Sequence, residues 1–286
     1  MDLAPEIERN VSAALAEDVG SGDWTAMLIP ESQQAHAAVV CRVPAVICGR
    51  AWFEACFRKL DPAVTVTWLV AEGAHVDAGT RLCEIRGKAR ALLTAERSAI
   101  NFLQMLSAVA TVTKRYVDAV AGMRAAIVDT RKTLPGLRLA QKHAVKTGGG
   151  TNHRLGLYDG ILIKENHIAA AGGIAAALKR AREIAPGNVW IQIEVESLEQ
   201  LGEALAAGAK MILLDNMSPA QMREAASITA GRAQLEASGG ITLDNVRAIA
   251  ETGVDRISIG SLTKDIKAVD LSMRIDQAGH DAGGKR

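Results

Sequence analysis

Apolar residues in the first third of the chain change from helical spacing to short runs. Residues 6–19 carry apolar side chains at helical spacing, and the Gly-rich segment 17–25 that follows predicts a loop. In this loop Asp18 and Asp23 are expected to bond to the backbone rather than to act as ligands. From 35 to 87, short runs such as AAVVCRV and VTVTWLV alternate with Gly and Pro. This pattern predicts a small sheet-rich domain.

Residues 94–120 again show apolar residues at helical spacing, now over many turns. The pattern predicts one long helix, with Thr94 as its N-cap. Arg97 then lies in the first turn, where free backbone N–H groups favour an anion. An exposed helical arginine is also commonly only a solubilising residue.

After residue 120 the chain repeats a unit in which a short apolar strand ends in polar residues and a helix follows. The strand ends are IVDTRK, ILIKEN, IQIEVES, MILLDN, LEASGG and ISIGSL. The last four recur about every 22 residues, and helices are expected to begin at Ser197, Ser218 and Thr242. Polar residues after every strand favour a β/α barrel with its chemistry at the C-terminal rim over a doubly wound sheet.

The expected fold class is therefore α/β, with a smaller N-terminal α+β sheet domain and an incomplete parallel β/α barrel of about six or seven strands. We expect residues 1–110 to form the first domain and 111–269 the barrel, with helix 94–120 connecting them. Residues 270–286 are expected to pack back on the first domain.

Composition excludes several kinds of partner. A net charge of +1 and 3% aromatic residues give no general attraction for nucleic acid, and no apolar run is long enough to span a bilayer. The N-terminus lacks the layout of a secretory signal, so we expect a cytoplasmic protein. The cysteines form no C-x-x-C pair and are expected to be core thiols rather than zinc ligands or disulfides: Cys41, Cys48, Cys56 and Cys83.

Cationic residues are concentrated between residues 129 and 167. Arginine is suited to carboxylate or phosphate, and Gly148–Gly150 and an apolar strand lie within the same stretch, so the pattern indicates an anion pocket rather than a basic surface loop. The stretch contains Arg131, Lys132, Arg138, Lys142, Lys146, Arg154 and Lys164, against the acids Asp129, Asp159 and Glu165.

The motifs of this stretch carry a resemblance to a known family. DTRKT, PGLR, GGGTNHRLGL and DGILIKENHI resemble the signature of the quinolinate phosphoribosyltransferases, and matching segments run from residue 17 to residue 262. The resemblance implies an incomplete barrel that transfers phosphoribosyl from phosphoribosyl pyrophosphate (PRPP) to quinolinate. Quinolinate loses a carboxylate as CO₂, which gives nicotinate mononucleotide and pyrophosphate for NAD biosynthesis.

The resemblance also implies roles for individual residues. Glu194 and Asp215 would hold the ribose and Mg²⁺, with the metal carried by PRPP and water and no organic cofactor. A homodimer or higher homo-oligomer would lend Arg97 across its interface. Lys132 and Lys164 would contact anionic groups of the two substrates, and which lysine serves which anion stays open. The implied catalytic residues are Lys132, Lys164, Glu194 and Asp215. The implied substrate-binding set is Arg97, Thr130, Arg131, Lys132, His153, Arg154, Lys164, Glu194, Asp215, Ser238, Gly239, Gly240, Ser258, Ile259, Gly260 and Ser261.

Several of these residues have a simpler explanation. Glu194 and Asp215 are also explained as counter-charges for the nearby cations, and the late glycines as tight turns rather than a phosphate site. His153 is either a proton donor or a hydrogen-bonding member of the pocket. His143 and His167 are equally explained by packing.

Other functions stay open. Lys164 at a strand end would suit a Schiff-base aldolase, and a related phosphoribosyltransferase-fold homologue with another substrate would share the motifs. The segment VAEGAHVDAGTRLCEIRG resembles a biotinyl or lipoyl carrier hairpin, but it holds no lysine, because Lys88 follows its last strand.

Overall fold

The computed structural model describes residues 2–276, and contacts within it define two units. Unit 1 consists of residues 2–111, 135–148 and 266–276, and unit 2 of residues 112–134 and 149–265. The barrel-forming residues are thus not one continuous stretch, because 135–148 lies inside the expected 111–269 but packs with unit 1. Within 2–276, no helix is long and apolar enough to cross a membrane.

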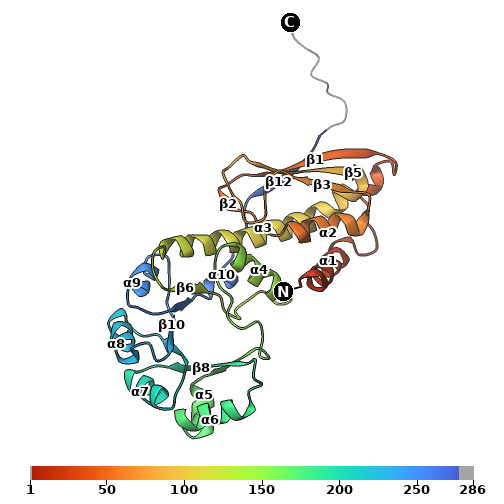
Figure 1. Cartoon of the computed structure of the whole chain (residues 1–286). Helices are drawn as coiled ribbons and strands as arrows, with labels where there is room; N and C mark the ends of the chain where they lie inside the picture. The colour runs from red at the N-terminus through yellow and green to blue at the C-terminus, as the bar shows by residue number, and fades with distance from the viewer. Residues whose placement is uncertain (1, 277–286) are drawn as a thin grey trace. The chain divides into compact units, whose positions relative to one another are not determined.

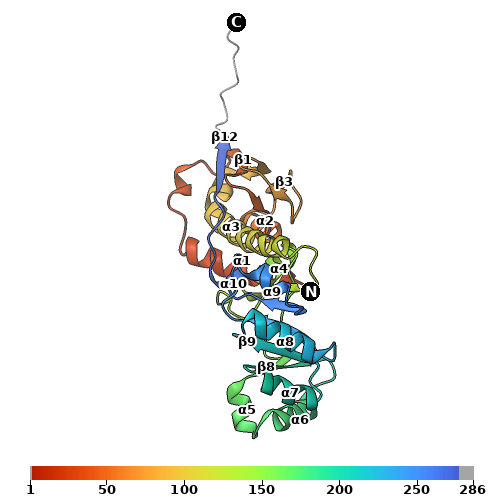
Figure 2. The same ribbon diagram turned by 90° about the vertical axis from the view of Figure 1, so that its left-hand side faces the viewer.

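Unit 1 contains an antiparallel sheet with the strand order β12-β1-β5-β3. Strand β12 lies beside β1 (Figure 2), so residues 271–276 pack on this unit, and 277–286 lie outside the described residues. The strands are β1 (Gln34–Cys41), β3 (Thr65–Trp68), β5 (Arg81–Lys88) and β12 (Leu271–Asp276), with a separate pair of β2 (Ala45–Val46) and β4 (His75–Val76).

Helices cover one face of this sheet (Figure 1). The core between them holds large buried side chains such as Trp52, Phe53 and Phe57 of α2 and Leu92 and Leu103 of α3. Burying each such side chain contributes about 1.5–3 kcal/mol relative to leaving it exposed. The helices are α1 (Ala4–Val19), α2 (Arg50–Leu60), α3 (Ala89–Ala119) and α4 (Arg138–Thr147), with a short 3-10 turn, η1 (Ala26–Leu28).

One local expectation is wrong in this unit. The region 35–87, expected to be rich in sheet, also holds helix α2, whose aromatic residues suit strands as well as a buried helical stripe. Thr94 is not an N-cap: α3 begins at Ala89, directly after β5, and the Thr94 hydroxyl instead donates to Asp23 Oδ2 at 2.9 Å. Good helix formers in ARALL extend the helix backward past Thr94.

Asp23 has the structural role expected of it, and this gives a pH prediction. Hydrogen bonds from the Ala26 backbone N–H and the Thr94 hydroxyl hold the pKa of Asp23 below its ordinary 3.8. A lowered folded-state pKa stabilises the fold above pH 3.8, and this stabilisation is lost as the pH falls through the folded value. Asp23→Asn is therefore expected to lower the melting temperature at pH 7, with the difference from the parent shrinking in acid.

Differential scanning calorimetry between pH 7 and pH 3 checks this prediction. Asp18→Asn is the matched control, because Asp18 is an exposed carboxylate in the same Gly-rich segment. An Asp23→Asn deficit that is constant with pH would show that the charge of Asp23 does not stabilise the turn.

Unit 2 contains a six-stranded parallel sheet, as the βα repeat predicts. Its strand order is β6-β11-β10-β9-β8-β7. The strands are β6 (Ala126–Val128), β7 (Gly160–Ile163), β8 (Trp190–Val195), β9 (Met211–Asp215), β10 (Gln234–Ser238) and β11 (Arg256–Ser258). Helices α7 and α8 lie along β8 and β9 (Figure 2). The helices are α5 (Glu165–Ala171), α6 (Ile174–Ile184), α7 (Leu198–Ala206), α8 (Pro219–Thr229), α9 (Val246–Ala250) and α10 (Ser261–Lys264).

Candidate active site

Strand register places the polar strand ends of unit 2 on one face of the sheet. Glu194 of β8 lies opposite Leu213 of β9, which lies opposite Glu236 of β10, and Asp215 lies opposite Ser238 one row further on. Since side chains two residues apart in a strand share a face, all of these point to the same side. The βα repeat therefore brings together residues that are distant in sequence.

This face encloses a cavity of about 290 Å³. Thr130 after the edge strand β6 and Lys164 after the opposite edge strand β7 line the same cavity as the central strands, so the sheet curves round it as an incomplete barrel. The lining residues are Thr130, Arg131, Lys132, His153, Arg154, Leu162, Lys164, Glu194, Leu213, Glu236, Ser238 and Ser258.

The remaining residues of the expected site do not line this cavity. Asp215 shares the face at the end of β9, where its Oδ2 accepts a 2.9 Å hydrogen bond from Asn216 Nδ2. Arg97 lies exposed on α3 in unit 1. The others lie in the turns that follow β10 and β11 or, for Ser261, at the start of α10: Gly239, Gly240, Ile259, Gly260 and Ser261.

Lys164 and Glu194 form an ion pair at the wall of the cavity. Lys164 Nζ lies 3.1 Å from Glu194 Oε2, with the lysine side chain 49% and the glutamate 12% exposed. The backbone N–H of Lys164 donates to His167 Nδ1 at 2.9 Å, so His167 caps the start of α5. The pair keeps a cation and a carboxylate available to a ligand, and His167 has a structural role.

Arg131 and Arg154 bring two guanidinium groups to the same cavity. Arg154 is buried, and its Nη1 donates to the Gly160 carbonyl at 3.0 Å. Burial, and then the neighbouring charge of Arg131, lower the pKa of Arg154 below its ordinary value. Because burial and like charge both disfavour the guanidinium, an anion bound between the two arginines would relieve both costs.

His153 is held by a buried network that contains residues not expected from the sequence. Its backbone N–H donates to Asp129 Oδ1 at 2.8 Å, and its Nε2 lies 2.9 Å from Gln192 Oε1. Gln192 Nε2 in turn donates to Glu236 Oε2 at 3.2 Å, a bond that fixes the orientation of the amide. Gln192 Oε1 can only accept, so His153 Nε2 carries the proton that it shares with Gln192.

Glu236 is the most important of the residues that the sequence reasoning missed. Its side chain is 1% exposed, with Oε2 3.1 Å from Arg256 Nε and Oε1 3.6 Å from His153 Nε2. Strand alternation could have found it, because Glu236 stands two residues before Ser238 and Gln192 two before Glu194. A strand reads as mostly apolar, which is why polar residues inside it were overlooked.

The glycine turns bring backbone close to the site. At Gly239, φ is +96°, and an added Cβ would lie 2.0 Å from Asn216 Oδ1. At Gly260, an added Cβ would lie 3.0 Å from Lys132 Cδ, so the glycine leaves room for the Lys132 side chain. Thr263 Oγ1 donates to the Lys132 carbonyl at 2.8 Å and holds that strand end against α10. Both glycines are thus explained by close packing, whatever ligand the turns bind.

A curved parallel sheet with arginines, lysines and a carboxylate at the strand ends is the arrangement of a β/α-barrel enzyme, whose active site lies at that rim. Models of the quinolinate phosphoribosyl transferase N-terminal and C-terminal domains match residues 23–107 and 109–274. The chain therefore belongs to the quinolinate phosphoribosyl transferase family, and its class of enzyme is the pentosyltransferases.

Individual relatives agree with this assignment. A probable nicotinate-nucleotide pyrophosphorylase [carboxylating] of Bacillus subtilis is 42% identical over 270 residues, covering 94% of this chain and 93% of that protein. A relative of the same name from Synechocystis is 40% identical over 264 residues, covering 91% and 90%. The solved nicotinate-nucleotide pyrophosphorylase of Francisella tularensis superposes with a TM-score of 0.92 at 44% identity, covering 95% of this chain and 96% of that one.

Proposed function

We propose that the protein transfers phosphoribosyl from PRPP to quinolinate and releases CO₂, giving nicotinate mononucleotide and pyrophosphate in NAD biosynthesis. The observation that carries the proposal is the shared cavity of Arg131 and Arg154, two close guanidiniums next to the Lys164–Glu194 pair. Quinolinate carries two adjacent carboxylates, which match two adjacent cations in number and sign. The names of the relatives describe the same reaction.

The reaction proceeds by displacement at C1 of the ribose. The ring nitrogen of quinolinate attacks C1, the bond from C1 to pyrophosphate breaks, and pyrophosphate leaves with its electron pair. The quaternary nitrogen then accepts the electrons of the C2–carboxylate bond as CO₂ departs, and a proton replaces it on C2. Glu194 and Asp215 stabilise the cation-like C1 electrostatically. His153, held by Gln192, is proposed to shape the pocket.

PRPP brings phosphate groups that the other residues of the site suit. We propose that Lys132 and Lys164 bind anionic groups of the two substrates, and that the Gly-rich turns after β10 and β11 bind the 5′-phosphate. At Gly240 an added Cβ would meet nothing within 4 Å, so a phosphate has room to approach the backbone there. The proposed set consists of the turn residues and the residues that flank them: Ser238, Gly239, Gly240, Ser258, Ile259, Gly260 and Ser261.

Mg²⁺ is proposed to enter with PRPP near Glu194 and Asp215. Over residues 2–276, these two acids belong to no group of three possible protein ligands, so they do not form an all-protein metal cage. This fits Mg²⁺, which keeps several waters and binds through one or two carboxylates plus substrate phosphates. The ion would neutralise charge on the departing pyrophosphate. We propose no organic cofactor.

A homodimer is proposed to complete the site by lending Arg97 from one subunit to the cavity of the other. Arg97 is exposed in the first half of α3 and is free to meet a second chain. Arg97→Ala and Arg131→Ala are each expected to be inactive alone. Mixing them in a two-fold dimer is expected to restore about a quarter of the parent activity, because half of the dimers are mixed and each has one intact site.

Subunit exchange followed by a steady-state assay measures this recovery. Exposed Lys179→Ala mixed with Arg131→Ala serves as the dilution control. If the Arg97 and Arg131 variants recover nothing after mass spectrometry has shown mixed dimers, the arginine is not shared between subunits.

We propose a cytoplasmic location for the protein. Four free cysteines, all buried, suit a reducing compartment.

The reaction itself is tested with quinolinate labelled in the 2-carboxylate, PRPP and Mg²⁺. Labelled CO₂ and nicotinate mononucleotide are expected in equal amounts, and only when PRPP is present. If no CO₂ is released, quinolinate is not the acceptor, and the alternative of a related enzyme with another acceptor would be favoured. Lys164 is about half exposed and ion-paired, which is not the apolar setting that a Schiff-base lysine needs, so borohydride with a keto substrate is expected to trap nothing.

A further inference from the structure

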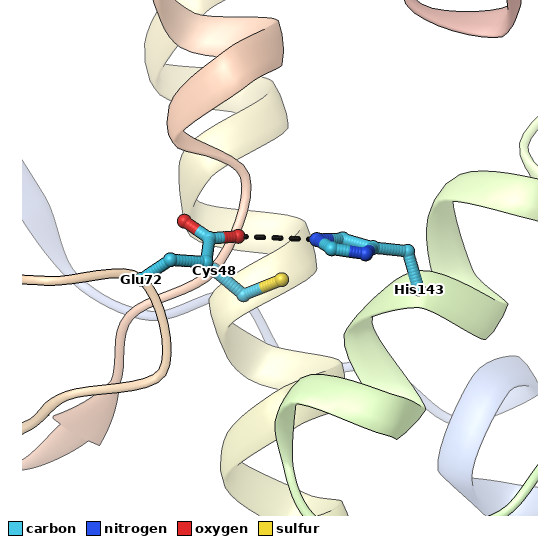
Figure 3. A group of neighbouring side chains, drawn as sticks. All are labelled: Cys48, Glu72 and His143. Carbon is cyan, nitrogen blue, oxygen red and sulfur yellow. Dashed lines mark hydrogen bonds and ion pairs between the residues drawn. The ribbon is translucent and has the colours of Figure 1, made fainter. Parts of the chain in front are cut away.

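Three side chains of unit 1 converge at a point that the catalytic proposal does not use. Figure 3 shows Cys48, Glu72 and His143 pointing toward one another from three separate segments. The Cys48 sulfur, a carboxylate oxygen of Glu72 and a ring nitrogen of His143 all lie within 4.8 Å of one another. Over residues 2–276, this is the one group of three or more such side chains close enough to share an ion.

Surrounding contacts hold the three groups in place. The Glu72 carboxylate accepts the Gly49 and Arg50 backbone N–H groups, at 2.8 Å to Oε1 and 3.2 Å to Oε2. Glu72 Oε1 also lies 3.2 Å from His143 Nε2. The His143 ring packs against Trp52, with 5.6 Å between the ring centroids. Such contacts orient ligands before an ion arrives.

Capping of α2 explains only one of the three residues. Glu72 satisfies the first N–H groups of that helix, and a carboxylate alone suffices for that. The cap does not require a thiol and an imidazole at the same point.

We propose that Cys48, Glu72 and His143 bind one zinc-like divalent transition-metal ion. A thiolate, an imidazole and a carboxylate together suit Zn²⁺ rather than Mg²⁺, and three protein ligands leave a fourth position for water. The ion replaces the thiol proton and the hydrogen bond between Glu72 and His143. This assigns Cys48 a role beyond that of the core thiol expected from the sequence.

A cavity in the same unit supplies a path to the site. It has a volume of about 740 Å³ and is lined by both Glu72 and His143, together with Arg50 and Trp52. The side chain of His143 is 29% and that of Glu72 31% exposed, while Cys48 is buried. An ion can therefore reach two ligands from solvent before it contacts the sulfur.

Cobalt substitution tests the sulfur ligand directly. The chelator-stripped full chain is titrated with Co²⁺, and the parent is expected to show a sulfur-to-cobalt charge-transfer band that saturates at one ion per chain and disappears when Zn²⁺ is added. Cys48→Ser is expected to lose the band. Cys56→Ser, which removes another buried thiol of the same unit, is expected to keep it. A parent without the band, or a Cys48→Ser variant that retains it, overturns the proposal.

His143→Gln gives a second test that does not depend on a change in the core. His143 is partly exposed, so the variant is expected to fold, which circular dichroism verifies. Competition with a chromophoric chelator is expected to show zinc affinity at least about tenfold weaker than that of the parent. The control is His36→Gln, another partly exposed histidine of unit 1. Equal zinc affinity in the parent and His143→Gln overturns the site.

Discussion

Replacing Arg154 with alanine is expected to lower kcat/KM for quinolinate by about a hundredfold or more. A close cation stabilises a bound anion by about 4 kcal/mol at an effective dielectric of 20. A hundredfold loss corresponds to about 2.8 kcal/mol, and the smaller figure allows for the cost of desolvating the two charges. Arg154 is buried in the cavity wall beside Arg131, where water screens its charge poorly. Steady-state kinetics with quinolinate varied at saturating PRPP measures the loss.

Two further variants make this test specific. Arg154→Lys keeps the charge but loses the planar fork that reaches the Gly160 carbonyl, so it is expected to recover only part of the activity. Arg223→Ala removes an exposed arginine of α8 and is expected to behave as the parent. Parent-like kinetics in a folded Arg154→Ala protein would show that the cavity does not bind quinolinate through this residue.

Glu236→Ala is expected to destabilise unit 2 by about 3 kcal/mol, since it leaves the partly buried guanidinium of Arg256 without its partner. Glu236 is 1% exposed and lies against Arg256, Gln192 and His153. In the variant, the Arg256 guanidinium is only 19% exposed and has too little contact with water to replace the lost ion pair. Glu236→Gln keeps the shape without the charge and is expected to lose less stability.

Urea unfolding followed by circular dichroism measures the change in stability. Because the chain has two units, hydrogen exchange of peptides from β10 and β11 is needed to locate the loss in unit 2. Glu224→Ala, an exposed acid on α8, is the control. A shift for Glu236→Ala within about 0.5 kcal/mol of zero, as for surface substitutions, would mean that the network contributes nothing to stability.

Sequence periodicity predicts the elements of unit 2 well because its βα repeat is regular. All six strand ends were placed, and Ser197 and Ser218 cap α7 and α8 as expected. Thr242 does not begin a helix, because α9 starts only at Val246 after a turn closed by the side chain of Asn245. Local sequence signals therefore predict the start of a helix correctly where the capping residue directly precedes the helix.

Contacts between distant segments could not be predicted in the same way. Helix α4 lies inside the range 111–269 that was expected to form the barrel, yet it belongs to unit 1, because position along the chain does not say which sheet a helix packs on. Glu236 and Gln192 were hidden inside strands that read as apolar. Cys48, Glu72 and His143 form no short motif, and only the fold brings them together.

The rate with quinolinate compared with that with nicotinate tests most directly whether the cavity requires a doubly anionic ring. Each acid is supplied at equal concentration with PRPP and Mg²⁺, and pyrophosphate and CO₂ are measured together. Quinolinate is expected to release both in equal amounts, and nicotinate, with one carboxylate, to react at least about a hundredfold more slowly. Equal pyrophosphate release from the two acids would contradict the account, because it would show that the reaction does not depend on a second carboxylate bound by the paired arginines.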